Sequence, residues 1–323
     1  NDEPIDTLDF WKSRIKKAWN LRIKLGLLDE NNNIFRLLHA EGDGCPGLVI
    51  DYYAKHVVIQ CHSVGMYLQQ HVIAEAVAAI LDKEVITIYS KSKETLHHFE
   101  GENQFLFGKK NEKCVAIEDG IKYEIDWVNG QKTGFFIDQR ENRTLLGKHS
   151  EGKKVLNTFC YSGGFSLAAL KNKATIVHSL DSSQKAMDLV ENNLKVNGFS
   201  KNHESITADA MKFMKELPEE YDVIVLDPPA FAKRKNARHK AIQGYKRLNA
   251  LAIQQIKPGG IIFTFSCSQI VDKALFNNTI AAAAIEAGRN VQILEQLHQP
   301  ADHPINICHP EGEYLKGLML HVS

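Results

Sequence analysis

The stretch that decides the fold is VIVLDPPAF, residues 223–231, in which four apolar residues lead into a carboxylate and two prolines. Such a short, continuous apolar run is typical of a strand buried on both faces of a parallel sheet. A second run, IIFTF at residues 261–265, is followed directly by SCS at residues 266–268. Open α/β sheets carry their reactive groups at the carboxyl ends of their strands, so we expect Asp227 and Cys267 to emerge at one sheet edge.

Working outward from these strands, the chain alternates between strand-like and helix-like segments from about residue 130 onward. Further strand candidates are VLNTFC (155–160), IVHSLD (176–181) and HESITAD (203–209). Between the last two, SQKAMDLVENNLKVNG (183–198) has helical spacing, and Gly198 is the expected C′ residue. Repeated βα units predict a parallel sheet with helices on both faces, which is an α/β, Rossmann-like domain.

The first part of the chain is organised differently. Residues up to about 27 have the spacing of an amphipathic helix, whose basic residues are more typical of a solvated face than of an RNA contact. The alternating segment CVAIEDGIKYEIDWV (114–128) contains Asp119-Gly120, which predicts a hairpin. The expected division is a smaller α+β domain over residues 1–108, a β-hairpin connector over 109–129 and the α/β domain over 130–323.

Composition excludes several classes of protein. The 323 residues carry 39 basic and 39 acidic side chains, and this zero net charge argues against a protein that coats nucleic acid nonspecifically, although a local basic patch is compatible with it. None of the six cysteines forms a CxxC pair, so we expect free thiols and no metal site. No apolar stretch reaches the roughly 18 residues that cross a bilayer, so we expect a cytoplasmic protein without a membrane partner.

A ligand site is expected where FCYSGGFSL (159–167) follows the first strand of the α/β half. Its small residues allow a tight turn and close approach of a ligand, and the spacing is not the GxGxxG dinucleotide fingerprint. Asp181, at the next strand end, can accept hydrogen bonds from ribose hydroxyls, and Asp209 can accept one from an adenine amino group. Each of these two acids has helix capping as its alternative role. With Asp227, they describe a pocket for S-adenosylmethionine (SAM).

Arginine geometry suits a carboxylate, so one of Gln139, Arg140 and Arg143 is expected to reach the methionine end of the cofactor, with surface ion pairing as the alternative. Cys160 is expected to serve mainly in packing. The residues predicted to line the cofactor pocket are Gln139, Arg140, Asn157, Phe159, Cys160, Tyr161, Ser162, Gly163, Asp181, Ser182, Asp209, Ala210 and Asp227.

The chain resembles the bacterial 23S ribosomal RNA large-subunit methyltransferase I family. The segments that carry the resemblance are HAEGDGCPGLVIDYY (39–53), GQKTGFFIDQRENR (130–143), VLNTFCYSGGFS (155–166), DPPAF (227–231), GYKRLN (244–249), TFSCS (264–268) and ADHPINICHPEGEYLKG (301–317). The resemblance implies a class I SAM-dependent enzyme that makes 5-methylcytosine and releases S-adenosylhomocysteine. It also implies an N-terminal PUA RNA-binding domain, which this chain lacks, and a start at Asn1 rather than Met suggests missing upstream residues.

The predicted chemistry needs a soft nucleophile, because carbon 5 of cytosine becomes reactive only after a thiolate adds at carbon 6. Cys267 is the predicted nucleophile, with a buried structural cysteine as the alternative, and Asp227 is expected to share a proton with N3. A basic segment, residues 232–249, follows the acid and suits a flipped base with its phosphates, unless it is simply solvated. The residues predicted to contact the substrate are Pro228, Pro229, Phe231, Lys233, Tyr245 and Lys246.

Alternative functions make different demands on these residues. Methylation of a guanine nitrogen in ribosomal RNA uses an existing lone pair and needs no thiol. A small-molecule methyltransferase would have little use for the first domain, and a non-catalytic RNA-binding ribosome-assembly factor would not need the thiol. The expected partner is large-subunit ribosomal RNA, naked or partly assembled, and a homodimer is permitted.

Overall fold

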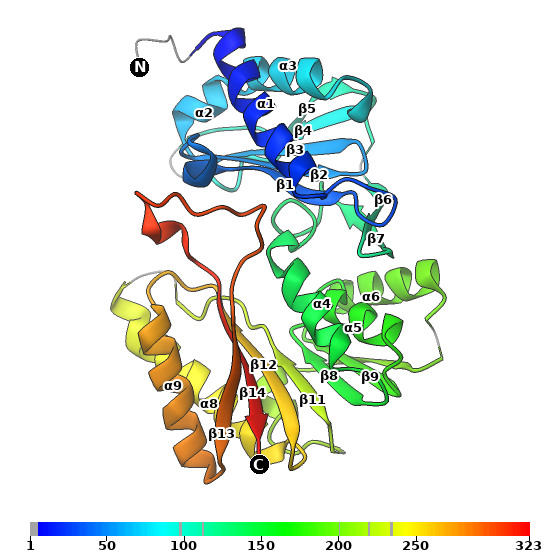
Figure 1. Cartoon of the computed structure of the whole chain (residues 1–323), viewed down its shortest axis with the longest axis vertical. Coiled ribbons are helices and arrows are strands. Elements are labelled where there is room, and N and C mark those ends of the chain that lie inside the picture. The colour runs from blue at the N-terminus through cyan, green and yellow to red at the C-terminus, as the bar shows by residue number, and fades with distance from the viewer. Residues whose placement is uncertain (1–5, 97–98, 112, 200, 219, 233–234) are drawn as a thin grey trace. The chain divides into compact units, whose positions relative to one another are not determined.

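The computed structural model describes residues 6–323 apart from residues 97–98, 112, 200, 219 and 233–234. The chain forms two compact units: Asn1–Asp138 with Pro300–Gly312, and Gln139–Gln299 with Glu313–Ser323 (Figure 1). These bounds differ from the expected division, because the break falls after Asp138 and a late segment joins the N-terminal unit. Among the described residues, no helix is long and apolar enough to cross a membrane.

The N-terminal unit is built on a five-stranded sheet in the order β1-β2-β3-β4-β5. Its strands are β1 (Ile34–His39), β2 (Leu48–Tyr53), β3 (His56–Cys61), β4 (Thr87–Ser90) and β5 (Gln104–Gly108). Its helices are α1 (Leu8–Lys24), α2 (Val64–Leu68) and α3 (Gln70–Leu81). Helices α1 and α3 pack against each other over one face of the sheet, and Trp11, Ile15, Phe35, Ile73 and Val77 lie buried in the resulting core (Figure 1).

The predicted hairpin is confirmed. Strands β6 (Lys113–Glu118) and β7 (Ile121–Asp126) pair antiparallel, and Glu118 lies opposite Ile121. The two residues between them, Asp119 and Gly120, have φ angles of 49° and 69°. Positive φ at both central positions is what a two-residue hairpin turn with the twist of the flanking strands requires.

The segment Pro300–Gly312 belongs to the N-terminal unit, where the buried side chain of Arg22 and the backbone amide of Arg36 bind it. The Asp302 carboxylate accepts a hydrogen bond from the Arg36 amide at 2.9 Å, and the Asp302 carbonyl accepts one from Arg22 Nη2 at 2.8 Å. The Arg22 guanidinium is itself paired with Asp43 at 2.6 Å. A Cβ added to Gly42 would collide with the Pro304 carbonyl, so the approach of this segment is close.

The second unit confirms the predicted α/β, Rossmann-like fold. Its seven-stranded sheet has the order β10-β9-β8-β11-β12-β14-β13. The strands are β8 (Lys154–Thr158), β9 (Ile176–Asp181), β10 (His203–Thr207), β11 (Val223–Leu226), β12 (Gly260–Ser266), β13 (Val291–Leu297) and β14 (Lys316–Val322). The five strands from β8 to β12 run parallel, whereas β14 runs antiparallel between β12 and β13. Strand order reverses between β8 and β11, which is where open α/β sheets bind ligands.

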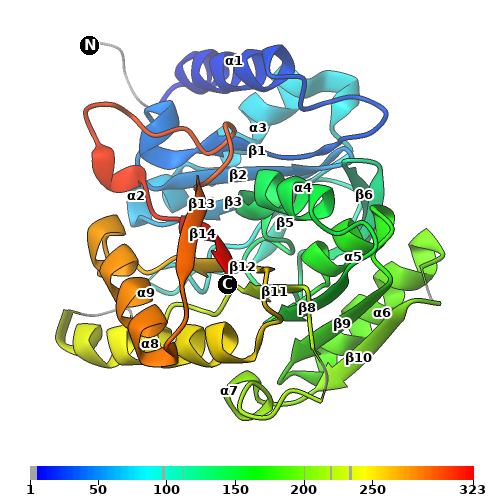
Figure 2. The same ribbon diagram turned by 60° about the horizontal axis from the view of Figure 1, so that its bottom comes forward.

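Helices cover both faces of this sheet (Figures 1 and 2). They are α4 (Arg140–Lys148), α5 (Gly164–Lys171), α6 (Gln184–Asn197), α7 (Ala210–Phe213), α8 (Arg238–Gln255) and α9 (Lys273–Ala287). Short 3-10 turns occur at Ala40–Asp43, Asp82–Glu84, Ile137–Gln139, Lys235–Ala237 and Pro310–Gly312. Helix α6 ends as predicted, with Gly198 left-handed at φ 72° and its amide bonded to the carbonyls of the last turn.

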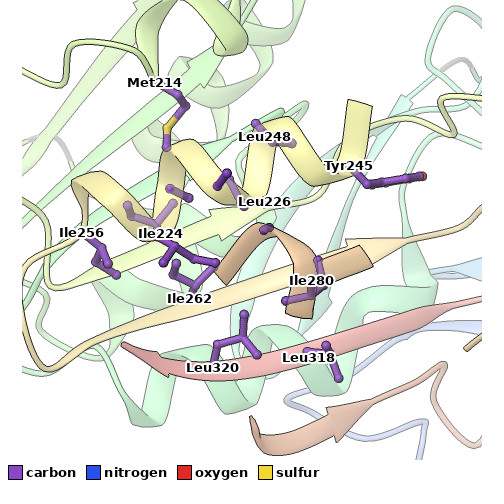
Figure 3. Close-up of a cluster of buried hydrophobic side chains, with 14 of the residues drawn as sticks. Met214, Ile224, Leu226, Tyr245, Leu248, Ile256, Ile262, Ile280, Leu318 and Leu320 are labelled. Carbon is purple, nitrogen blue, oxygen red and sulfur yellow. The ribbon is translucent and has the colours of Figure 1, made fainter. Parts of the chain in front are cut away.

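The two faces have separate cores. On one face, α4 and α5 contribute Leu146 and Phe165, which pack against Val155, Val223 and Phe263 of the strands. On the other, α8 and α9 cover β11, β12 and β14, and Figure 3 shows Leu248 and Ile280 beside Ile224, Ile262 and Leu320. Tyr245 lies at the end of this second cluster, with its ring directed away from the aliphatic side chains (Figure 3). Both faces of the central strands are therefore buried, which explains their unbroken apolar sequences.

Candidate active site

Strand register brings the predicted acid and thiol to the same sheet edge. Strand β11 pairs with β12 so that Leu226, the last residue of β11, lies beside Thr264. Asp227 directly follows Leu226, and Cys267 follows Ser266 at the end of β12. The two functional groups thus leave neighbouring parallel strands at their carboxyl ends, as the sequence predicts.

The loop after β8 adopts an unusual backbone. Phe159 and Tyr161 have φ angles of 56° and 47°, and Gly163 has 80°. Left-handed conformations of non-glycine residues cost about 1–3 kcal/mol each and persist where the surroundings hold them, often at ligand sites. Here β9 supplies the restraint: the Cys160 amide donates to the Leu180 carbonyl at 3.2 Å, and the Tyr161 amide donates to Asp181 Oδ2 at 3.2 Å.

Asp181 is placed as an acceptor beside this loop. Besides the bond from Tyr161, its Oδ1 accepts the Ser183 amide at 3.0 Å. The N-cap of α6 is Ser183, whose hydroxyl accepts the Ala186 amide, so Asp181 is not the capping residue. Its partly exposed carboxylate keeps lone pairs for two further donors, as a ribose diol requires. Ser182, which lies between Asp181 and Ser183 in the sequence, is exposed.

Asp209 caps a helix, which was the alternative considered for it. Its Oδ1 accepts the Lys212 amide at 2.8 Å at the start of α7. A contact with adenine would use the other oxygen of this exposed carboxylate. The neighbouring Ala210 is buried in the core under α8.

Three of the residues predicted to line the cofactor pocket are buried beneath the loop rather than exposed at its surface. Asn157 is 1% exposed and donates to Ser166 Oγ at 2.8 Å, and Ser166 is bonded in turn to Ser179 at 2.6 Å. Cys160 packs against α6, and burial raises the pKa of its thiol well above the usual range. Ser162 is also buried, and its carbonyl accepts Asn193 Nδ2 at 2.9 Å. These side chains shape the loop.

The segment before β8 reaches the acid. Gln139 Nε2 donates to Asp227 Oδ2 at 3.1 Å, and Gln139 Oε1 accepts a hydrogen bond from Asn142 Nδ2 at 2.6 Å. Arg140 and Arg143 are both buried, and the Arg143 stem lies so close to Gly164 that a Cβ there would sit 2.9 Å from its Cδ. Gln139 therefore contacts the acid, and its partner Asn142 was not singled out in the sequence. A contact of Gln139, Arg140 or Arg143 with the methionine end of the cofactor stays a prediction.

The surroundings of the thiol include two residues whose pKa is shifted by burial. Cys267 is partly exposed, and the next residue, Ser268, donates its hydroxyl to the Ala232 carbonyl at 2.9 Å. Burial raises the pKa of Tyr245 to about 12, and the negative charges of Cys267 and Asp227 add to the rise. Lys316 Nζ donates to the Ser268 carbonyl at 2.8 Å, and burial lowers the pKa of this ammonium. Sequence analysis did not identify Lys316, because its place depends on an antiparallel neighbour.

Only some of the residues predicted to contact the substrate lie at the surface. Pro229 is exposed and Phe231 half-buried, whereas Pro228 is buried. Tyr245 is fully buried behind Phe231, with ring centroids 4.6 Å apart. Lys246 pairs with Glu286 of α9 at 2.7 Å. Lys233 lies outside the described residues.

Comparison with known proteins identifies relatives of this chain. Residues 60–319 match the family model of S-adenosylmethionine-dependent methyltransferases. The chain is 42% identical to the ribosomal RNA large subunit methyltransferase I of Aeromonas hydrophila, over 99% of this chain and 82% of that protein. It is 41% identical to the protein of the same name from Photobacterium profundum, over 98% of this chain and 81% of that protein. The chain belongs to the ribosomal RNA large subunit methyltransferase I family. The resemblance found in the sequence is confirmed, and so is SAM as the cofactor.

Solved structures agree on the fold. A protein from Streptococcus mutans described as a SAM-dependent methyltransferase superposes with a TM-score of 0.85 at 22% identity, covering 98% of this chain and 81% of that one. The residues present fit the cofactor of the methyltransferase I family. Asp181, which is only partly buried, offers acceptors for hydroxyl groups beside the left-handed turn at Phe159–Gly163.

Proposed function

We propose that this chain transfers a methyl group from SAM to carbon 5 of a cytosine in large-subunit ribosomal RNA. The RNA class follows from relatives named ribosomal RNA large subunit methyltransferase I. The choice of carbon 5 is supported by one observation: a thiol and a carboxyl group leave adjacent strand ends, at Cys267 and Asp227. An RNA substrate made in the cytoplasm also agrees with a cytoplasmic enzyme.

In this mechanism the Cys267 thiolate adds to carbon 6 of the cytosine and forms a C6–S bond. The electron pair of the C5–C6 double bond moves toward carbon 5 and the ring, and Asp227 shares a proton with N3 so that the charge is not left on the base. SAM supplies an electrophilic methyl group on its sulfonium. Carbon 5 gains that methyl group as its bond to sulfur breaks, which leaves S-adenosylhomocysteine. The N3 proton returns to Asp227, a base removes the C5 proton, the C6–S bond breaks, and Cys267 recovers its thiolate.

The protein's other residues prepare this step. Gln139 fixes the orientation of the Asp227 carboxylate through its 3.1 Å hydrogen bond. The exposed Pro229 and half-buried Phe231 offer apolar surface beside the acid on which a planar base can lie. Asp181 and the turn at Phe159–Gly163 hold the cofactor at the neighbouring strands.

The test combines product identity with capture of the adduct. The protein is incubated with methyl-tritiated SAM and unmodified large-subunit RNA, and the labelled nucleosides are separated by chromatography. Label in 5-methylcytidine is the expected result. RNA containing 5-fluorocytidine should then give a protein–RNA complex that survives denaturing gels, because fluorine at carbon 5 cannot leave as a proton does.

Three results would count against the proposal, each against a different part of it. Label in a methylguanosine would assign the chain to nitrogen methylation, which needs no thiol. Label in 5-methylcytidine without a trapped complex on fluorinated RNA would reject the covalent route. Cofactor binding without any methyl transfer to naked or partly assembled RNA would favour the assembly-factor alternative.

A further inference from the structure

Lys316 is a buried lysine beside the thiol. It is the first residue of β14 and is only 6% exposed. The antiparallel register of β12 and β14 pairs Lys316 with Ser266, the residue directly before Cys267. A residue remote in sequence is thereby fixed at the end of the strand that delivers the nucleophile.

The Lys316 ammonium group also contacts the residue that follows the cysteine. Nζ donates to the Ser268 carbonyl at 2.8 Å and to the Tyr314 carbonyl at 2.7 Å. Cys267 therefore lies in the sequence between Ser266, which pairs with Lys316 in the sheet, and Ser268, whose carbonyl accepts a hydrogen bond from Lys316. An ammonium group has three protons, and these two bonds use two of them.

Two neutral carbonyls solvate a buried cation but do not neutralise its charge. The negative groups that act on Lys316 are Cys267 most strongly, then Glu313 before β14 and Asp272 at the start of α9. Tyr245 of α8 also faces Cys267, but burial keeps that hydroxyl protonated, with a pKa of about 12. Glu313 and Asp272 are both exposed to solvent, which screens them.

We propose that Lys316 is a positioning residue whose ammonium group stabilises the thiolate of Cys267. The inference rests on the proposed function for its purpose, because a cytosine nucleophile must be a thiolate before attack and is released as one afterwards. An adjacent cation stabilises the thiolate both before it attacks the cytosine and when it is released. The backbone bonds of Nζ hold that cation in place without covering the thiol.

The test measures ionisation of the thiol without any methyl transfer. The full chain is treated with iodoacetamide across a range of pH, and alkylation of Cys267 is quantified by peptide mass spectrometry. Cys308, which is exposed, provides an internal reference in the same molecules. In the parent protein, Cys267 alkylation should reach half its maximum at a lower pH than that of Cys308.

Two substitutions separate charge from shape. Lys316→Met removes the charge and should raise the Cys267 midpoint by at least one pH unit, leaving Cys308 unchanged. Lys316→Arg keeps the charge and should retain most of the parental midpoint. If Lys316→Met does not bind SAM, Lys316→Gln replaces it, because the amide still donates hydrogen bonds but has no charge.

Lys91→Met is the matched control for loss of a buried lysine. Lys91 lies in the N-terminal unit, donates to the Gly130 carbonyl and also has its pKa lowered by burial. The inference is wrong if neither neutral variant at position 316 shifts the Cys267 midpoint, or if Lys91→Met shifts it equally. A shift at Cys267 together with label in methylguanosine would keep this inference while rejecting the cytosine reaction, so the two failures are distinguishable.

Discussion

The side chains of Gln139 and Asp227 are hydrogen-bonded at 3.1 Å although 88 residues separate them in the sequence. Gln139 begins the second unit, and Asp227 directly follows its strand β11. The Gln139 amide cannot rotate freely, because Asn142 donates to its oxygen at 2.6 Å. The acid predicted to manage the proton on the substrate is therefore oriented by a residue from the segment that precedes the first strand of the sheet.

Gln139→Glu should impair catalysis by replacing this donor with a second carboxylate. Two carboxylates in contact raise the pKa of one of them, and loss of a hydrogen bond to a charged group costs about 1.5–3 kcal/mol, roughly a tenfold to hundredfold loss of kcat. Methyl transfer measured from pH 5 to 9 should show the acidic limb displaced upward. Gln292→Glu adds the same charge at an exposed position of β13, outside the basic segment, and should leave the profile unchanged. Parental kinetics in Gln139→Glu would mean that this bond has no role in turnover.

Cys267→Ser should abolish methyl transfer while cofactor binding persists. An alcohol is far less acidic than a thiol and adds poorly to a pyrimidine, so a loss of at least about a thousandfold is expected for a missing covalent nucleophile. Calorimetric titration with SAM and a turnover assay separate the two properties. Cys308→Ser changes an exposed thiol and should match the parent in both. Turnover in Cys267→Ser near the parental rate would exclude the covalent mechanism.

Gly163→Ala should destabilise the protein and weaken SAM binding more than Gly198→Ala. Both glycines are left-handed, at φ 80° and 72°, and an alanine in that region costs about 1–2 kcal/mol. At Gly163 the added Cβ would also lie 3.0 Å from Leu167 Cδ1, whereas nothing lies within 4 Å at Gly198. Chemical denaturation gives the free energy of unfolding, and calorimetry gives the affinity. Equal losses in the two variants would show that the cofactor loop tolerates the extra carbon.

The protein should lose stability as the pH falls from 6.5 toward 4, in part through His203. Burial lowers the pKa of this ring to about 4, with Glu191 opposing and His178 adding to the change. In that window the unfolded chain binds a proton that the folded protein does not, so stability present above pH 6.5 is lost on acidification. The shift corresponds to roughly 3 kcal/mol at 1.36 kcal/mol per pKa unit. Urea denaturation of His203→Gln should show a shallower pH dependence, whereas exposed His309→Gln should follow the parent.

Local signals in the sequence predict local structure well. Asp119-Gly120 specifies its hairpin and Gly198 its helix end, because each needs only the φ preferences of one or two residues. The continuous apolar run at Val223–Leu226 predicts a doubly covered parallel strand, and Asp227 then necessarily emerges at the ligand edge.

Contacts between residues that are far apart in the sequence cannot be predicted from such local signals. The contact of Lys316 with the Cys267 loop arises from the antiparallel register between β12 and β14. The attachment of Pro300–Gly312 to the N-terminal unit depends on Arg22 and Arg36, more than 260 residues earlier. Burial of Tyr245 behind Phe231 likewise follows from tertiary packing, since its basic neighbours in the sequence indicate a solvated loop.

The path of the chain through its two units constrains the order of events during synthesis on the ribosome. Arg22 emerges early, yet its acceptor at Asp302 is translated 280 residues later. Strand β14, which separates β12 from β13 in the finished sheet, is made later still. Neither unit can therefore reach its final hydrogen-bonding pattern while translation is in progress upstream of residue 302. Completion of both units depends on the same stretch, residues 300–323, so nascent chains that stop before it carry two unfinished units rather than one finished and one missing.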